Sequence, residues 1–183
     1  MKYAVVVYRS RHGATKQYAE WLSEKLDCPI YDVNQINASQ LLAYHTIIYG
    51  SPLYTRKMDG VKQLVDFYDR LKDRTLVSFT VGLADPDQTA YYDMVIDANI
   101  PREMQENIHF FHLPGKVDYS TVGLGAKLRA GFYRFLIRLL VRPEKRDYEL
   151  NMMLAPAQNV DLMDESSLEP LIDFVRTTPA ANE

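Results

Sequence analysis

The sequence predicts an α/β fold, in which five parallel strands form a doubly wound sheet with helices on both faces. Two observations predict it. Several short runs of aliphatic and aromatic residues carry almost no charge, as strands covered on both faces do. Between these runs, apolar residues recur with helical spacing, and strands that alternate with helices in this way form parallel βαβ units. The length of 183 residues fits one domain.

The five strands are expected at residues 3–8, 30–33, 45–49, 76–81 and 108–113. Pro29 opens the second of them. Because proline removes a hydrogen-bond donor from the ladder, we expect this strand at an edge of the sheet. An edge position for the second strand favours the order 2-1-3-4-5 over the other order that is common in doubly wound sheets.

Four helices are expected beside these strands. The first is marked by Tyr18, Ala19, Leu22 and Leu26; the second by Val61, Leu64, Val65 and Tyr68; the third spans 89–98; and the last begins behind Ser166 or Ser167 and carries Leu168, Leu171, Ile172 and Val175. Residues 115–165 exceed what five simple units require, so we interpret them as an insertion near the fifth strand of a single domain, 1–183. Residues 178–183 are interpreted as a frayed tail.

Composition excludes several classes of protein. The chain has 21 basic and 24 acidic residues and a net charge of −3, which argues against a nucleic-acid partner. Cys28 is the only cysteine, which excludes a disulfide framework and a cysteine-based metal site. His109 and His112 fall on one strand at a spacing that sends them to opposite faces, so no metal site is expected. The sequence has no long apolar run and no signal-peptide pattern at its start, so a cytoplasmic location is expected.

The segment after the first strand, Tyr8–Thr15, lies where sheets of this kind bind ligands. Ser10 and Thr15 offer hydroxyl donors, and Gly13 lets the backbone come close to a ligand. The helix that follows directs free N–H groups and its positive end to the same point, and two arginines and a histidine add positive charge. This arrangement is suited to a phosphate. The alternative is an ordinary strand–helix turn with a serine N-cap.

The same segment resembles the phosphate loop of flavodoxins, which has the pattern Ser/Thr-x-Thr-Gly-x-Thr. It is still more similar to the flavodoxin-domain family that includes menaquinone-dependent protoporphyrinogen oxidase, whose loop has the pattern Ser-Thr-Arg-x-Gly-x-Thr. The positions that match are Ser10, Arg11, Gly13 and Thr15, while Arg9 replaces the first hydroxyl residue. The similarity extends through most of the chain and includes the segments Ile48–Ser51 and Phe132–Arg138.

The resemblance implies an FMN cofactor that is held by three segments. The phosphate would be held by Ser10, Arg11, His12, Gly13, Ala14 and Thr15. One side of the isoalloxazine ring would be flanked by residues 51–57, in particular Ser51, Pro52, Leu53, Tyr54 and Thr55. The other side would be covered by residues 81–87, in particular Val81, Gly82, Leu83 and Asp85. Tyr54 is the aromatic side chain expected to stack on the ring; its alternative role is that of an ordinary loop tyrosine.

The resemblance also implies an activity, that of an FMN-dependent oxidoreductase. The family member named above implies quinone-linked oxidation of protoporphyrinogen IX, in haem biosynthesis. The partners would then be an organic electron donor, such as a porphyrinogen, and a quinone or a redox protein as acceptor. No side chain presents itself as an essential acid or base. Two alternatives stay open, a non-enzymatic flavodoxin electron carrier and a regulatory module without a cofactor.

The charge around the expected flavin differs from that of low-potential flavodoxins, which resemble one another in being strongly acidic there. Four cations of this chain fall in loops near the expected flavin: Arg9, Arg11, Arg56 and Lys57. Three carboxylates oppose them: Asp59, Asp85 and Asp87. Because nearby cations stabilise a reduced, anionic cofactor, we expect a less negative final potential than that of a typical carrier, which favours a catalyst.

Residues 127–142 are expected to form a basic amphipathic helix within the insertion. One sector holds the basic residues Lys127, Arg134, Arg138 and Arg142, and the opposite side holds Leu128, Phe132, Phe135, Leu136 and Leu139. Such a helix suits an anionic membrane surface or a groove of a partner protein. Peripheral contact with the inner membrane face through 125–142 is therefore one hypothesis. The alternative is a surface helix that packs its apolar face on the domain.

Overall fold

The computed structural model describes residues 2–54, 56–118, 124–141, 143, 154 and 159–178. The chain divides into two compact units, of which the first comprises Met1–Gly115 and Met163–Glu183 and the second comprises Lys116–Leu162. The second unit falls inside the expected insertion at 115–165. Apart from Thr178, the tail expected at 178–183 lies outside the described residues.

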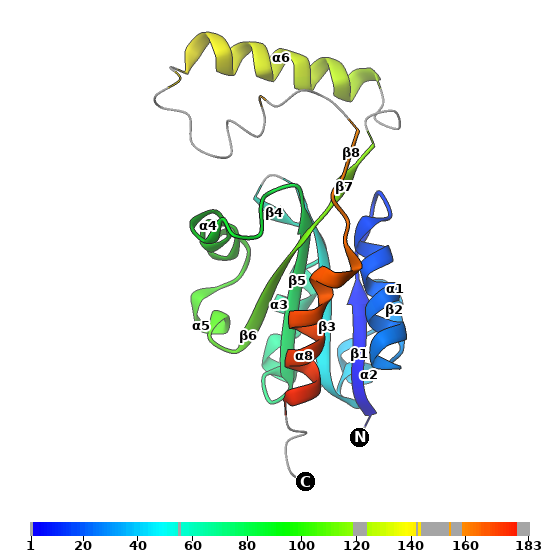
Figure 1. The fold of residues 1–183 in the computed structure, drawn as a ribbon. Coiled ribbons are helices and arrows are strands. Elements are labelled where there is room, and N and C mark those ends of the chain that lie inside the picture. The colour runs from blue at the N-terminus through cyan, green and yellow to red at the C-terminus, as the bar shows by residue number, and fades with distance from the viewer. Residues whose placement is uncertain are drawn as a thin grey trace. The chain divides into compact units, whose positions relative to one another are not determined.

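The first unit is built on a parallel sheet (Figure 1). Its parallel strands are β1 (Lys2–Tyr8), β2 (Ile30–Asp32), β3 (Tyr44–Tyr54), β5 (Thr75–Gly82) and β6 (Ile108–Pro114). They are ordered β2-β1-β3-β5-β6, and each neighbouring pair is parallel. Counted along the chain without the short β4, this is the order 2-1-3-4-5, so the predicted fold and the edge position of the second strand are confirmed.

The third parallel strand is longer than predicted: the sequence predicts its end at Tyr49, whereas β3 continues to Tyr54. The sequence Gly50-Ser51-Pro52 is typical of a strand end, since proline cannot donate to a ladder. In the structure, β5 pairs with β3 as far as Pro52, opposite Val81. Beyond that point β4 (Lys57–Met58) pairs antiparallel with the end of β3 and keeps it extended to Tyr54. The strand is therefore prolonged by neighbours that the local sequence does not reveal.

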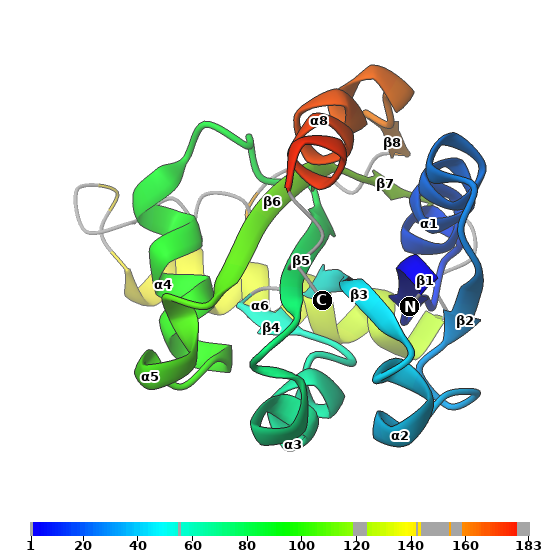
Figure 2. The ribbon, with the colours of Figure 1, turned by 90° about the horizontal axis from the view of Figure 1, so that it is seen from below.

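Helices cover both faces of this sheet. They are α1 (Ala14–Leu26), α2 (Ala38–Leu41), α3 (Lys62–Leu71), α4 (Thr89–Asn99), α5 (Arg102–Gln105) and α8 (Glu169–Thr177), and the 3-10 helix η2 (Glu165–Leu168) directly precedes α8. Figure 2 shows α1 and α8 on one face of the sheet and α3 on the other. The predicted apolar faces are confirmed for α1 and the last helix, since Tyr18, Leu22 and the four predicted residues of the last helix are almost fully buried.

The last α-helix was expected behind Ser166 or Ser167, and α8 begins at Glu169, behind both serines. The 3-10 helix η2, which was not predicted, precedes it and begins at Glu165. The Asp164 carboxylate accepts hydrogen bonds from the Ser166 N–H at 2.9 Å and the Ser166 hydroxyl at 2.6 Å. Asp164 therefore caps η2, so that helical backbone begins four residues before α8.

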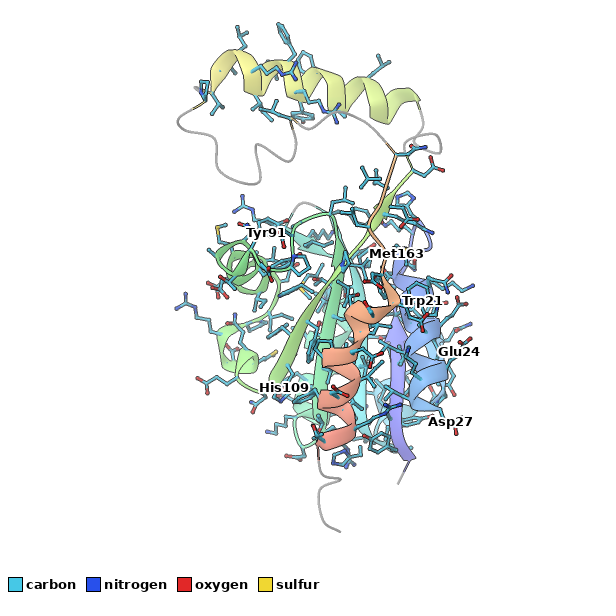
Figure 3. The ribbon with its side chains drawn as sticks, viewed as in Figure 1. Trp21, Glu24, Asp27, Tyr91, His109 and Met163 are labelled. Carbon is cyan, nitrogen blue, oxygen red and sulfur yellow. The ribbon has the colours of Figure 1, made fainter. Side chains whose placement is uncertain are left out.

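Tyr18 of α1 ties together the two points where the insertion leaves and re-enters the first unit. Its hydroxyl donates to the Pro114 carbonyl at 2.8 Å and accepts from the Asp164 N–H at 3.1 Å. Trp21 of the same helix and Met163 both pack against the core that lies between α1, α8 and the sheet (Figure 3). The two ends of the insertion, at Pro114 and Asp164, are thus fixed to α1.

The second unit contains a two-stranded antiparallel ladder of β7 (Lys116–Val117) and β8 (Val160–Asp161), and the helix α6 (Leu124–Leu140). A helix was predicted at 127–142; the structure begins it three residues earlier and ends it two residues sooner. The side chain of Lys127 and the residue Arg142 lie outside the described part of the structure. Most of the predicted apolar side is exposed: Leu128 to 66%, Phe132 to 61%, Phe135 to 59% and Leu139 to 66%, whereas Leu136 is half-buried. Within the described ranges, no helix has the length and apolar character that a membrane span requires.

Candidate functional site

The loop between β1 and α1, residues 9–13, turns sharply into the helix. Its first residue is held against β3, since the Arg9 N–H donates to the Gly50 carbonyl at 2.9 Å. Gly13 is the N-cap of α1 and has φ 87°, a left-handed conformation that favours glycine. The Ser10 hydroxyl accepts from the Gly13 N–H at 3.1 Å. The alternative of a serine N-cap is therefore wrong, because Ser10 folds the loop itself and, among the described residues, no side chain caps α1.

The predicted phosphate residues differ in their exposure. Arg11, His12 and Gly13 are exposed, Ser10 is half-buried, and Ala14 and Thr15 are buried. A Cβ atom built on Gly13 would meet no heavy atom within 4 Å, so the space beside the loop is open. The first N–H groups of a helix have no partners within it. The loop thus combines an uncapped helix start, open space and positive charge, which are the requirements of an anion site.

Asp59 links this loop to the hairpin of β3 and β4. Its carboxylate accepts from Arg11 Nε at 2.8 Å and lies 3.9 Å from Arg9 Nε. Its side chain is only 17% exposed, while those of Arg11 and Arg9 are 55% and 36% exposed. The Asp59 N–H donates to the Pro52 carbonyl at 3.1 Å, which fixes the carboxylate to the end of β3. One acid therefore balances part of the charge of two arginines at the predicted flavin site.

Tyr54, the predicted stacking residue, lies in the same cluster. The guanidinium carbon of Arg11 is 5.4 Å from the centre of its ring, within the range of a cation–π contact. The ring of His12 lies edge-on to it, with 6.0 Å between the centres and 84° between the planes. Burial raises the pKa of Tyr54; Arg11 lowers it and Asp59 raises it further. The phenol is therefore neutral near pH 7, and the structure brings it beside the predicted phosphate loop.

The rest of the second predicted segment lies at the end of β3. Ser51 and Pro52 are buried, Leu53 and Tyr54 are half-buried, and Thr55 lies outside the described residues. The Ser51 hydroxyl is one of two buried side-chain oxygens, with that of Ser78, that have no hydrogen-bond partner among the described residues. Leaving a buried hydroxyl unpaired is costly, and such groups are often completed by a ligand or water. Ser51 can therefore offer a hydrogen bond to a bound molecule.

The third predicted segment follows β5, the neighbour of β3. Val81 and Gly82 are buried, Leu83 is half-buried and Asp85 is exposed. The Gly82 carbonyl accepts from the Gly115 N–H at 2.7 Å. Because β1, β3 and β5 are adjacent and parallel, their carboxyl ends meet at one edge of the sheet. The three predicted segments therefore lie at the same edge, which is where sheets of this type bind ligands.

Sequence reasoning missed part of this edge. Asp59 was seen only as an opposing charge, and Tyr92 and Gly115 were not singled out. His112 was weighed only as a metal ligand; it is half-buried beneath the segment after β5. No local signal in the sequence points to these residues, because each contacts either a residue more than 30 positions away or a residue of a different structural element.

The expected placement of the two histidines of β6 on opposite faces is confirmed. His109 packs against Phe174 of α8, with 4.2 Å between the ring centres, and His112 stacks on Tyr92 of α4. The two rings thus point to opposite faces of the sheet. In the described ranges, no group of three or more metal-ligating side chains gathers anywhere.

A doubly wound sheet with a cationic, glycine-bearing loop at the end of its first strand defines the class of flavodoxin-like proteins. Residues 5–149 match a family model that is described as a flavodoxin domain. This match spans well over half of the chain, and the chain therefore belongs to the flavodoxin domain family.

Solved structures of low identity are also similar to this chain. A flavodoxin from the domain Archaea has 17% identity and a TM-score of 0.44, and the match covers 64% of this chain and 87% of that one. Oxidised Flavodoxin 2 from Bacillus cereus has 16% identity and a TM-score of 0.44, over 72% and 94% of the two chains. The Trp repressor binding protein from Bacillus subtilis has 17% identity and a TM-score of 0.42, over 77% and 98%. No curated protein matches the sequence.

Proposed function

We propose that this protein binds FMN at the carboxyl edge of its sheet and acts as an FMN-dependent oxidoreductase. Proteins of the flavodoxin family typically bind FMN. The observation that carries the proposal is the β1–α1 loop, which combines an uncapped helix start, a left-handed Gly13 beside open space and the exposed Arg11. A phosphate ester with nearly two negative charges matches that loop in charge and in hydrogen bonding.

The residues of the three segments would divide the binding of FMN between them. Residues 10–15 would hold the phosphate, Ser51–Tyr54 would flank one side of the ring, and Val81–Asp85 would cover the other. The buried Ser51 hydroxyl would gain a partner, and Tyr54 would contribute an aromatic face. Bound FMN would supply the redox chemistry, taking hydrogen or electrons from an organic donor and passing them to an acceptor. The chain itself would bind and orient the FMN and set its reduction potential.

The acceptor that we propose is a quinone, and α6 supports it. Membrane quinones are reached from the bilayer surface, and α6 exposes large apolar side chains in a stretch that contains no acidic residue. Oxidation of a porphyrinogen such as protoporphyrinogen IX is the specific reaction proposed. A non-enzymatic electron carrier is the second candidate, and turnover of a porphyrinogen with a soluble quinone analogue distinguishes the two, since a carrier gives none.

The test of the cofactor site replaces Ser10 and Thr15 by alanine together. Each hydroxyl is expected to make a charge-assisted bond worth about 1.5–3 kcal/mol to the phosphate, so the dissociation constant for FMN should rise at least tenfold. Fluorescence titration of the apoprotein with FMN and with riboflavin, which lacks the phosphate, measures this. The preference of the wild type for FMN over riboflavin should largely disappear in the double variant.

The matched control is Ser39→Ala with Thr177→Ala. It also removes one serine and one threonine hydroxyl, but these bind Arg70 on the surface and carbonyls within α8. The control should bind FMN as the wild type does. The proposed site is wrong if the Ser10 and Thr15 double variant keeps the affinity and the preference of the wild type.

A further inference from the structure

A buried polar cluster lies beneath the β5–α4 loop, residues 83–88. It consists of Thr80 from β5, Tyr92 from α4 and His112 from β6, and we call it the loop anchor. Thr80 is 1% exposed and Tyr92 is 2% exposed. The cluster belongs to none of the three segments that were predicted to touch the cofactor, yet it borders the third of them.

The contacts of the loop anchor run from the sheet to the loop. His112 Nδ1 lies 2.8 Å from Thr80 Oγ1 on the neighbouring strand. The imidazole stacks face to face on the ring of Tyr92, with 3.5 Å between centres and 12° between planes. The Tyr92 hydroxyl donates to the Ala84 carbonyl at 3.1 Å, and Ala84 is itself 2% exposed. A continuous set of contacts thus connects β6 to the backbone of the loop.

The electrostatic state of His112 suits this role. Burial lowers the pKa of His112 to about 4, so its ring is neutral near pH 7. A neutral imidazole can exchange one hydrogen bond with Thr80 and stack on a phenol without a buried charge. Tyr92 also contacts Tyr91, which is labelled in Figure 3; the two rings meet edge to face with 5.3 Å between their centres.

A second contact holds the loop from Gly115, which directly follows β6 at the start of the insertion. The Gly115 N–H donates to the Gly82 carbonyl at 2.7 Å. The two backbones are so close that a Cβ atom on Gly115 would lie 3.0 Å from the Gly82 oxygen. The chain is therefore fixed at Gly82 and again at Ala84. Leu83, one of the residues expected to cover the flavin, lies between these two points.

We propose that Tyr92 and His112 are positioning residues for the cofactor, which hold the Ala84 carbonyl and thereby fix the β5–α4 loop where it covers the flavin ring. This inference rests on the proposed function and deepens it. Tyr92 and His112 act through the backbone of the loop. They are expected to affect the affinity for FMN and the local environment of its ring.

The experiment compares three single variants. Tyr92→Phe removes only the hydroxyl that binds Ala84, and His112→Phe keeps an aromatic ring but removes the contact with Thr80. Tyr68→Phe is the matched control: its hydroxyl, equally part of a buried tyrosine, accepts from Asn107 Nδ2 just before β6 begins. That position is at the other end of the sheet from the candidate site.

The first measurement needs no cofactor. In the apoprotein, the amides of Asp87 and Gln88 are hydrogen-bonded within the loop, at 3.0 Å each. Loss of one tethering hydrogen bond should speed their hydrogen exchange roughly fivefold or more in Tyr92→Phe and in His112→Phe. Exchange in Tyr68→Phe should match the wild type.

The second measurement is the binding and the visible spectrum of FMN. Tyr92→Phe and His112→Phe should raise the dissociation constant roughly fivefold and shift the absorption band of the bound flavin, while Tyr68→Phe should change neither. A general loss of stability would weaken binding without shifting the band of the flavin that remains bound.

Three results would overturn the inference, and each has a distinct meaning. Unchanged exchange in both variants shows that the loop anchor does not hold the loop. Faster exchange with unchanged affinity and spectrum shows that the loop does not position the flavin. Failure of the wild type to bind FMN removes the proposed function, and the positioning role with it; the first two results leave the proposed function standing.

Discussion

At the scale of single residues, Asp59 decides how much positive charge the candidate site presents. Its carboxylate pairs with Arg11 at 2.8 Å and lies near Arg9, and its low exposure makes the interaction less screened than a surface pair. The sequence places several cations near the proposed flavin site, and two of them, Arg9 and Arg11, share the one acid Asp59. The positive charge there is therefore smaller than the count of arginines indicates.

We expect Asp59→Asn to raise the final reduction potential of bound FMN. Removing one negative charge leaves Arg11 and Arg9 unbalanced, and the reduced cofactor, which gains negative charge, is stabilised. The shift should be about 1 kcal/mol, or about 40 mV for a one-electron step, at low salt. A spectroelectrochemical titration measures it.

The control for this shift is Asp66→Asn, which makes the same change of charge on α3, where Asp66 pairs with the exposed Lys62. It should leave the potential where it is in the wild type. A potential that falls, or that moves no more than in the control, would show that Asp59 does not balance the arginines at the flavin.

At the scale of elements, β3 is the strand on which the site is built. It lies between β1 and β5, its end carries Ser51–Tyr54, and its Gly50 carbonyl accepts from the Arg9 N–H at the start of the candidate phosphate loop. Gly50 has a further role in packing. The ring of Phe79 on β5 covers it, so that a Cβ atom on Gly50 would lie 2.3 Å from Phe79 Cζ. The strand can approach β5 in this way only with glycine at this position.

We expect Gly50→Ala to lower the free energy of unfolding by about 1–3 kcal/mol, because the buried Phe79 ring must move to admit the new methyl group. The midpoint of urea unfolding, followed by circular dichroism, measures this. Gly131→Ala in α6 is the comparison, since a Cβ atom there meets nothing within 4 Å and alanine favours a helix. Equal midpoints for Gly50→Ala and the wild type would refute the packing role.

At the scale of the whole molecule, charge is distributed unevenly along the chain. The net charge is −3, yet α6 contains only basic charged residues. Exposed apolar side chains of this size are uncommon on a soluble surface when they gather on one helix. Together with the basic charge they match a bilayer surface that contains anionic lipids. We therefore propose that α6 is the part of the chain that contacts the membrane.

We expect the protein to float with vesicles that contain anionic lipid and not with purely zwitterionic ones, and added salt should weaken the binding. Replacing Phe132 and Phe135 by serine should reduce binding at least tenfold, because each buried phenylalanine contributes about 1.5–3 kcal/mol. Flotation in a density gradient measures it. The control, Met94→Ser with Leu162→Ser, removes two exposed apolar side chains outside α6 and should bind normally. Failure of the wild type to float with anionic vesicles would exclude the proposal.

Much of the architecture could be predicted because its signals are local. The runs around Val5, Ile47 and Val77 are mainly apolar and contain no acidic, lysine or arginine residue, and the spacing of Tyr18 and Leu22 marks one face of a helix. Pro29 placed the second strand at the edge. The candidate phosphate loop could also be predicted, because its glycine and hydroxyl residues are adjacent in the chain. The length of β3 and the aspartate-capped 3-10 helix before the last helix could not, because pairing with β4 and the choice among neighbouring caps depend on the folded chain.

The amino-acid order by itself determined the class of fold, the strand order and the segments that meet at the candidate site, since hydrophobic periodicity and turn chemistry act over a few residues. Only the tertiary structure decided which side chains face one another there. The pairing of Arg11 with Asp59 and the stacking of His112 on Tyr92 join residues 48 and 20 positions apart in the sequence. Such contacts depend on the register of strands and the direction of each side chain, and these are fixed only when the whole sheet packs.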